Sequence, residues 1–145
     1  MPWVQVWLHF VWSTKDRFPY LTDEIRFKIF EHTRESAREK GIHIDFINGW
    51  VEHVHCLVSL GTDQTLSWLM QNIKGESSFW INKNKLTKTK FAWQDEYFVV
   101  GVSESTLPSV RRYIANQEKH HKSISFDHEF ENFLTRAGFK KFKDS

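Results

Sequence analysis

The sequence predicts an α+β fold of the ferredoxin-like type, in which a four-stranded antiparallel sheet carries two helices on one face. Four segments have the side-chain pattern of strands, and two of the segments between them have that of amphipathic helices. Their order along the chain is βαββαβ, which is a split βαβ unit repeated twice. Additional helices are expected after the fourth strand. The predicted strands span residues 3–14, 42–50, 53–60 and 97–103.

The first strand and the first helix are predicted from the N-terminal forty residues. Residues 3–14 are apolar on both faces of a strand, which favours a central position in the sheet. Thr22 or Asp23 can cap a helix that runs to Lys40, and Gly41 can end it. Helical spacing predicts that this helix buries Ile25, Ile29, Phe30, Thr33 and Ala37.

The second and third strands are predicted to form an antiparallel hairpin, because Asn48-Gly49 is a turn signal between them. On the second strand, Ile42, Ile44 and Phe46 are expected on one side, with Asn48 as a further candidate. Side chains of the third strand alternate between two faces. The core face is predicted from its apolar members, and His53 and His55 then share the opposite face. The apolar members are Val54, Cys56, Val58 and Leu60.

A second amphipathic helix follows the loop at residues 61–64. Its apolar stripe is predicted from Leu66, Leu69, Met70, Ile73, Ser77, Trp80 and Ile81. After the fourth strand, Ser105 or Thr106 can cap a helix that has Pro108 in its first turn and runs to about Lys122. A last short helix is predicted at residues 126–137, with Phe130, Phe133 and Leu134 packing and Gly138 ending it.

The composition is that of one globular domain. We expect residues 1–145 to form a single unit, with a core at about 3–138 and a tail at 139–145. The net charge of +2 argues against a protein that coats nucleic acid through overall basicity. The single cysteine, Cys56, cannot form an internal disulfide, which fits a reducing compartment. No apolar run approaches a membrane span, and the N-terminus lacks the pattern of a signal peptide, so a cytoplasmic location is expected.

His53-Val54-His55 is the first candidate site. Two imidazoles on the same face of a strand can converge on one ion, and imidazole nitrogen is a common ligand of divalent metals. The spacing alone favours two surface histidines on a half-exposed strand, because so short a motif often occurs by accident, and that alternative stays open.

The helix after the fourth strand carries a second set of polar residues. Leu107, Val110, Ile114 and His121 are predicted to form its packing stripe. Tyr113, Gln117 and His120 form a neighbouring stripe, one above another. A phenol, an amide and an imidazole could therefore lie at the edge of the helix contact with the sheet.

Taken together, these residues resemble a known family. His53-Val54-His55 is similar to the His-hydrophobic-His motif of HUH nucleases. Its combination with Tyr113-x-x-x-Gln117 on a late helix resembles the single-tyrosine transposases of the insertion-sequence 200/605 group. The similarity extends from Val4 to Gly138 and includes further stretches, namely Trp12-Ser13-Thr14-Lys15, Ile73-Lys74-Gly75-Glu76-Ser77-Ser78, Trp93-Gln94 and His120-His121. Family members often have a small, glycine-rich segment after Trp93-Gln94, where this chain has Asp95-Glu96-Tyr97.

The resemblance implies a transposase that cleaves and rejoins single-stranded DNA at insertion-sequence ends. Tyr113 would be the nucleophile and would form a 5′-phosphotyrosine intermediate. His53, His55 and Gln117 would hold one divalent metal, Mg²⁺ or Mn²⁺. His120 is a possible supporting residue.

The resemblance also implies the partners. The DNA would be single-stranded with hairpin ends, and the protein would be a homodimer in which the tyrosine helix of one subunit can complete the site of the other. No membrane partner is expected. Candidate phosphate contacts are Lys74, Arg111, Arg112, Lys83, Lys85 and Lys88, and Trp and Phe rings could stack on unpaired bases.

Three alternatives remain open. A non-catalytic single-stranded nucleic-acid-binding module on the same fold would explain the aromatic and basic residues. A small zinc hydrolase would use the paired histidines, but it lacks a third strong ligand, since Glu52 is expected on the opposite strand face. A replication or conjugation nickase would use the same chemistry, but such proteins usually carry further domains.

Overall fold

A four-stranded antiparallel sheet lies at the centre of the protein, and helices cover both of its faces. The computed structural model describes residues 2–121 and 125–136. The strands are β1 (Trp7–Ser13), β2 (His43–Gly49), β3 (His53–Ser59) and β4 (Phe98–Val102), in the spatial order β2-β3-β1-β4. Every pair of neighbours is antiparallel. The predicted α+β fold with the ferredoxin-like strand order is therefore confirmed.

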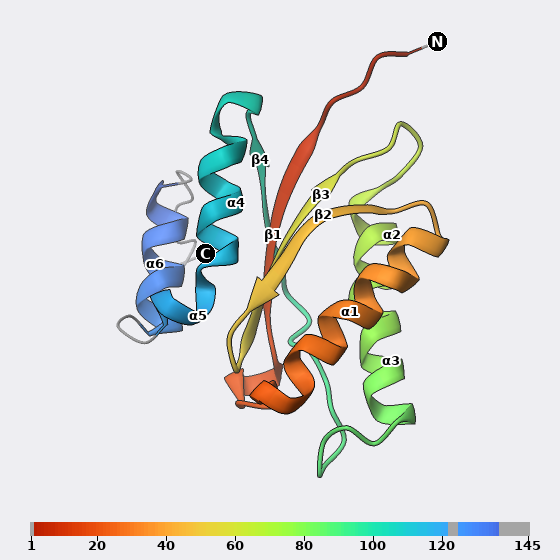
Figure 1. The fold of residues 1–145 in the computed structure, drawn as a ribbon, viewed down its shortest axis with the longest axis vertical. Coiled ribbons are helices and arrows are strands. Elements are labelled where there is room, and N and C mark those ends of the chain that lie inside the picture. The colour runs from red at the N-terminus through yellow and green to blue at the C-terminus, as the bar shows by residue number, and fades with distance from the viewer. Residues whose placement is uncertain (1, 122–124, 137–145) are drawn as a thin grey trace, which may run out of the picture.

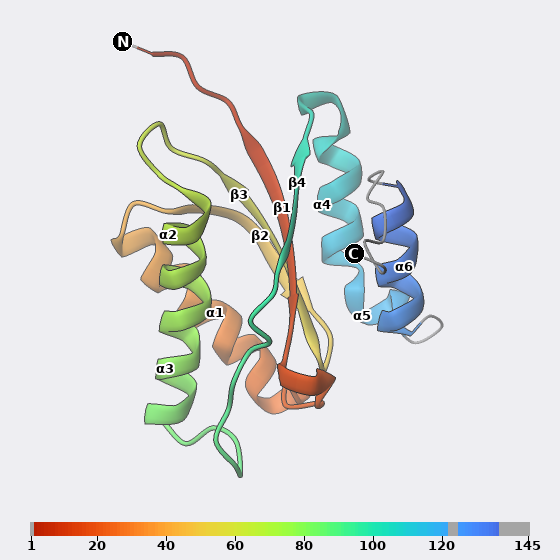
Figure 2. The same ribbon diagram turned by 180° about the vertical axis from the view of Figure 1, so that it is seen from behind.

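The helices divide into two groups (Figures 1 and 2). On one face lie α1 (Asp23–Glu39), α2 (Leu66–Met70) and α3 (Glu76–Lys83). On the other lie α4 (Leu107–Ala115), α5 (Gln117–His120) and α6 (Phe126–Arg136). Short 3-10 turns occur at Lys15–Arg17 and Glu104–Thr106. Among the described residues, none of these helices combines the length and apolar character needed to cross a bilayer.

The first strand is shorter than predicted at its N-terminal end. Trp7 pairs with Ser59 on one side and with Val102 on the other, and both partner strands end there. The apolar residues before Trp7 therefore lie beyond the sheet, and the side chain of Trp3 is 97% exposed. The prediction of a central strand is correct, because β1 has a partner on each side.

The main core lies between the sheet and α1, α2 and α3. The predicted stripe of α1 is confirmed, with Ile25 half-buried and the other four members buried. Gly41 follows the helix with φ +74°, a conformation that favours glycine, and so ends it as predicted. The sheet and the second helix supply many of the other core residues, which include Phe10, Trp12, Val54, Cys56, Val58, Leu69, Ile73 and Ile81.

A β-bulge in β2 corrects one prediction. The ladder between β2 and β3 shifts between Ile44 and Phe46, so the alternation of side chains changes there. Ile44 belongs to the main core, whereas Phe46 packs with the cluster under α4. The expectation that Ile42, Ile44 and Phe46 share one side is therefore wrong, and the bulge turns Asn48 toward α4. The Asn48 amide donates to the backbone oxygens of Ile114 and Ala115, at 2.9 and 3.2 Å.

A π-turn interrupts the second predicted helix and reorients Lys74. The turn spans Gln71–Gly75, between α2 and α3. Lys74 is only 8% exposed, and its ammonium donates to the backbone oxygens of Gln94 (2.7 Å), Asp95 (3.2 Å) and Glu96 (3.4 Å). Lys74 therefore holds the loop before β4, and its role as a DNA contact stays a prediction.

The C-terminal helices also differ from the predicted pattern. The helix expected to run to about Lys122 breaks at Asn116 (φ −98°, ψ 17°), which separates α4 from α5. The last helix begins at Phe126 as predicted, and Phe130, Phe133 and Leu134 pack with it against Val11 and Phe98. Gly138 and the predicted tail at 139–145 lie outside the described residues.

The position of Cys56 provides a test of this fold. Its side chain is fully buried, and burial raises the pKa of the thiol to about 12 despite the opposing charge of Arg34. At pH 8 only about one thiol in ten thousand is then ionised, and the thiolate is the reactive form. We expect no reaction with Ellman's reagent at pH 8 in the native protein and one equivalent after unfolding in guanidinium. Rapid reaction of the native protein would contradict the described core.

Candidate active site

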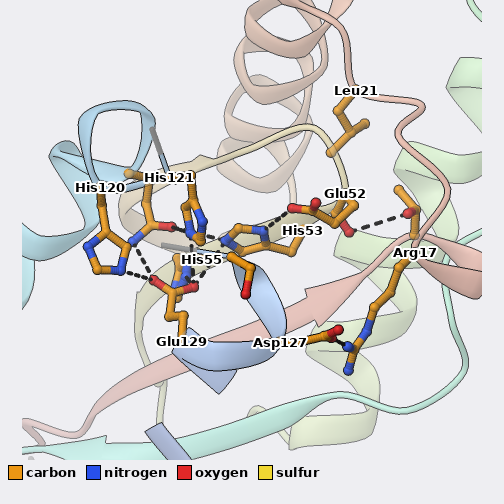
Figure 3. Close-up of polar contacts among 12 residues, drawn as sticks. Arg17, Leu21, Glu52, His53, His55, His120, His121, Asp127 and Glu129 are labelled. Carbon is orange, nitrogen blue, oxygen red and sulfur yellow. Dashed lines mark hydrogen bonds and ion pairs between the residues drawn. The ribbon is translucent and has the colours of Figure 1, made fainter. Parts of the chain in front are cut away.

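The two histidines of β3 lie on the sheet face that α4, α5 and α6 cover. His53 and His55 are 0% and 1% exposed, so the alternative of two surface histidines is wrong. The strand alternation places Val54, Cys56 and Val58 in the main core on the other face, as predicted. Figure 3 shows both rings pointing into the same space, together with side chains from the C-terminal helices.

Apolar packing positions the polar stripe of α4 and α5 over β3. Leu107 and Ile114 are buried against Leu57, which lies on the same face of β3 as the two histidines. Gln117 is fully buried at the start of α5, and its Oε1 lies 3.0 Å from His53 Nε2. The Tyr113 ring lies perpendicular to the His55 ring, with 5.4 Å between centroids. The four residues predicted to form the site thus meet within one chain.

Glu129 of α6, which sequence reasoning missed, lies at the centre of this group. Its side chain is 3% exposed, and its Oε1 lies 3.3 Å from His53 Nε2, 3.2 Å from His55 Nε2 and 3.1 Å from His121 Nε2. The other carboxylate oxygen, Oε2, accepts hydrogen bonds from the Tyr113 hydroxyl and from Gln117 Nε2. His120 Nε2 lies 3.2 Å from the same Oε2.

A sequence signal for Glu129 existed. Phe126, Phe130 and Phe133 follow the helical spacing of a buried stripe, and Glu129 lies three residues after Phe126 on the same face. An acidic residue inside an apolar stripe must find partners when it is buried. The statement that the chain lacks a third strong ligand is therefore wrong.

Two groups of ligand-type atoms share Glu129. In each group the histidine and carboxylate atoms lie within 4.8 Å of one another: His53, His55 and Glu129 form one, and His120, His121 and Glu129 the other. His121 was predicted to pack, but its Nε2 lies 3.1 Å from Gln117 Oε1 and so faces the site. His120, predicted as a supporting residue, is at the more exposed edge.

The outer nitrogens of both β3 histidines also have partners. His53 Nδ1 lies 2.8 Å from Glu52 Oε1, and His55 Nδ1 lies 2.9 Å from His9 Nε2. Glu52 belongs to the turn before β3, so its carboxylate reaches the ring instead of pointing away as expected. His9 lies on the same sheet face, opposite Leu57. Such contacts fix the tautomer and the orientation of a ring whose other nitrogen is offered to a metal.

Burial and hydrogen bonding shift the pKa values of the site residues in opposite directions. Burial lowers the pKa of His55 to about 4 and also lowers that of His9. Burial opposes charging of His53 as well, but hydrogen bonds to Glu129 and Glu52 outweigh it and raise the pKa. Burial would raise the pKa of Glu129, but hydrogen bonds from three histidines lower it below its usual range. Burial and the Glu129 carboxylate raise the pKa of Tyr113, so the phenol is a neutral donor.

A cavity of about 1070 Å³ opens beside Tyr113 and Glu129. One wall is formed by β4, including Val100 and Gly101, and another by Ser109 and Val110 of α4. Arg136 and Asn132 of α6 also line it. The polar cluster is thus reached from a space large enough for a nucleotide-sized group.

The basic residues predicted to contact DNA lie in different environments. Arg111 forms a two-pronged ion pair with Asp45, with distances of 2.7 and 3.3 Å. Arg112 is exposed, and its guanidinium donates to Ser109 Oγ at 3.3 Å. Lys83 at the end of α3, and Lys85 and Lys88 in the segment after it, are exposed on the opposite side of the sheet from α4 (Figures 1 and 2). The structure does not bring them to the polar cluster.

Relatives share the fold and much of the chain length. The ISDra2 transposase TnpA of Deinococcus radiodurans is 25% identical over 118 residues, which are 78% of this chain and 84% of that protein. A crystal structure of a Deinococcus radiodurans R1 protein assigned as a transposase superposes with a TM-score of 0.65 at 24% identity, covering 80% of this chain and 93% of that one. A REP-associated tyrosine transposase bound to a REP hairpin superposes with a TM-score of 0.64 at 16% identity, covering 86% and 73%.

The family model described as "Transposase IS200 like" matches residues 3–117 of this chain. That match includes the paired histidines of β3, together with Tyr113 and Gln117. The chain therefore belongs to the IS200-like transposase family.

Proposed function

We propose that this transposase cleaves and rejoins single-stranded DNA at insertion-sequence ends through a 5′-phosphotyrosine intermediate on Tyr113, with the help of a divalent metal. The observation that carries the proposal is the meeting of the Tyr113 hydroxyl, two imidazoles and the Gln117 amide within one chain. Family membership supports the reaction class, since the matched residues include this set.

The donor set fits a divalent ion. His53 and His55 would offer Nε2, because their Nδ1 atoms face Glu52 and His9. Gln117 would offer Oε1, because its amide nitrogen donates to Glu129 Oε2 and to the Tyr113 backbone oxygen. Nitrogen and oxygen donors of this kind suit Mn²⁺ or Mg²⁺. A bound ion would offset negative charge on the scissile phosphate.

The protein residues would then act as follows. Tyr113 Oη attacks phosphorus, the bond from phosphorus to the 3′ oxygen breaks, and the DNA 5′ end becomes linked to Tyr113. The phenolic proton is lost, and the departing 3′ oxygen gains a proton, so the exchange of one phosphodiester for another needs no cosubstrate. Rejoining is the reverse attack by a 3′ hydroxyl on the phosphotyrosine. The raised pKa of Tyr113 keeps the resting phenol neutral until a phosphate is in place.

The proposed substrate is single-stranded DNA flanked by hairpins. One structural relative was solved with a REP hairpin bound, which supports this choice. The cavity beside Tyr113 would admit the strand that carries the scissile phosphate. Arg111, Arg112 and the lysines at positions 83, 85 and 88 remain proposed phosphate contacts. Arg111 would use its Nη1, because its Nε and Nη2 donate to Asp45.

A homodimer is also proposed, on the resemblance alone. Within the described chain, Tyr113 already lies beside the histidines of its own β3, so the tyrosine helix needs no exchange to complete a site. A non-catalytic nucleic-acid-binding module remains the alternative function, and a zinc hydrolase regains a third ligand in Glu129. Only the proposed function requires a covalent link between Tyr113 and DNA.

Replacing Tyr113 by Phe tests the reaction. We expect Tyr113→Phe to lose the covalent adduct with labelled single strands from element ends, because no hydroxyl remains to attack phosphorus. Binding should change by less than about threefold, since only one oxygen is removed. The adduct is measured on denaturing gels with Mn²⁺, and chelation of the metal should abolish it in the unchanged protein. Tyr20→Phe is the matched control, because the Tyr20 hydroxyl bonds to the Lys90 backbone oxygen away from the site. An adduct in Tyr113→Phe would refute the assignment.

Filling the cavity tests the route of the strand. Ser109→Trp places a large ring at the cavity wall, whereas Ala115→Trp places it on an exposed part of α4 that does not line the cavity. We expect Ser109→Trp to slow adduct formation at least about tenfold by displacing the strand from its reactive position. Ala115→Trp should leave the rate within about twofold. Equal rates for the two variants would place the strand elsewhere.

Neutralising the lysine segment tests the proposed phosphate contacts. The triple change of Lys83, Lys85 and Lys88 to Gln should weaken hairpin binding and reduce the slope of log Kd against log salt by up to about 3, or roughly one per lost contact. Fluorescence anisotropy across a salt series measures the slope. The same change at Lys15, Lys28 and Lys40 alters net charge equally at other exposed positions. If both triple variants lower the slope equally, the effect is one of net charge.

A further inference from the structure

The Glu129 carboxylate of α6 has contacts that the proposed function does not use. The family match ends at residue 117, and α6 begins at Phe126. We propose that Glu129 is a ligand of the divalent metal, and that its second oxygen holds the Tyr113 hydroxyl, so that α6 is part of the active centre. This inference rests on the proposed metal site at His53, His55 and Gln117, and it deepens that site by adding an anionic ligand.

The separations between the donor atoms fit a shared coordination shell. Glu129 Oε1 lies 3.3 Å from His53 Nε2 and 3.2 Å from His55 Nε2, and His53 Nε2 lies 3.0 Å from Gln117 Oε1. Two ligand atoms that each lie about 2.1 Å from one ion, in neighbouring positions of its shell, are roughly 3.0–3.4 Å apart. The Glu129 oxygen therefore stands at a ligand's distance from both imidazoles.

The direction of the ring hydrogens gives a second argument. A neutral imidazole has one N–H, and that of His53 belongs on Nδ1, because the Glu52 carboxylate there can only accept. The lone pair of His53 Nε2 then faces two further acceptors, Gln117 Oε1 and Glu129 Oε1. Acceptor atoms placed in this way repel one another unless a proton, such as one on His121 Nε2 at 3.1 Å from both oxygens, or a cation lies among them. A metal ion satisfies all three together.

The position of Glu129 follows from packing as well as from its own contacts. Phe126 stacks on the His53 ring at 4.0 Å, and Phe133 lies edge-on to His9 at 5.1 Å. At the start of α6, Asp127 pairs with Arg17, whose guanidinium also lies over the Phe126 ring. Apolar and ionic contacts on both sides of Glu129 therefore direct its side chain at the histidines.

The two carboxylate oxygens of Glu129 have different partners. Oε1 faces the imidazoles of β3, whereas Oε2 accepts from the Tyr113 hydroxyl and from Gln117 Nε2. One side chain would thus fix the distance between the metal and the nucleophile. A shell with a carboxylate, an amide and two imidazoles mixes ligands that suit Mn²⁺ with ligands that Mg²⁺ rarely takes. We therefore expect Mn²⁺ to bind more tightly than Mg²⁺ before DNA is added.

Direct measurement of Mn²⁺ binding tests the proposal. The full chain, stripped with a chelator, is titrated with Mn²⁺ without DNA, and free Mn²⁺ is followed by electron paramagnetic resonance. We expect Glu129→Gln to weaken binding at least about tenfold, because an anionic ligand becomes a neutral amide. Glu131→Gln removes the same charge from an exposed position on α6 and should bind as the unchanged protein does. At Mn²⁺ concentrations that saturate both proteins, Glu129→Gln should still form the Tyr113 adduct more slowly.

The outcomes separate this inference from the proposed function. Equal Mn²⁺ affinity of Glu129→Gln and the unchanged protein would overturn the ligand role and leave the site of His53, His55 and Gln117 standing. Failure of the unchanged protein to bind Mn²⁺, with adduct formation that persists under chelation, would instead overturn the proposed metal. Equal adduct rates at saturating Mn²⁺ would refute the proposal that Glu129 positions the Tyr113 hydroxyl for the reaction. If Glu129→Gln does not fold, the anomalous signal of Mn²⁺ in crystals of the unchanged protein decides, and an ion beyond about 3 Å from Glu129 contradicts the proposal.

Discussion

Burial of two imidazoles on a central strand is the constraint on which the site depends. A buried ring nitrogen without a partner is costly, so each must be paired. The protein meets this requirement from several directions: Glu52 comes from the preceding turn, His9 from β1, Gln117 from α5 and Glu129 from α6. Because these partners are far apart in the chain, the site forms only when the sheet and the C-terminal helices have come together.

The break at Asn116 makes this convergence possible. Tyr113 lies in the last turn of α4, and Gln117 begins α5, so the two side chains need not follow one continuous helical face. The Asn48 amide holds the backbone oxygens of Ile114 and Ala115, immediately before the break. The bulge in β2 turns Asn48 toward them. The bulge in β2 is thereby connected, through the Asn48 side chain, to the break between α4 and α5.

Period-two alternation was sufficient to predict that His53 and His55 share a face, and the spacing of Tyr113 and Gln117 to predict a second polar group. What alternation cannot supply is the shift at Ile44 and Phe46, because a bulge leaves no periodic signal. The burial of Lys74 and the orientation of His121 were not foreseen for a related reason, since the π-turn and the break at Asn116 rotate helices away from ideal spacing. Glu129 depended on where α6 packs, which local pattern does not determine.

The π-turn links the length of the second helix to the start of β4. Such a turn holds more residues than an α-helical one, and here it turns Lys74 onto the loop at Gln94 and Asp95. Loss of one residue from this turn would rotate the preceding and following segments by about 100° against each other. Either Lys74 would leave the loop, or Ser77 would leave the Trp93 ring nitrogen that donates to it. A change in the length of this helix would therefore displace the loop that leads into β4, the edge strand that borders the cavity.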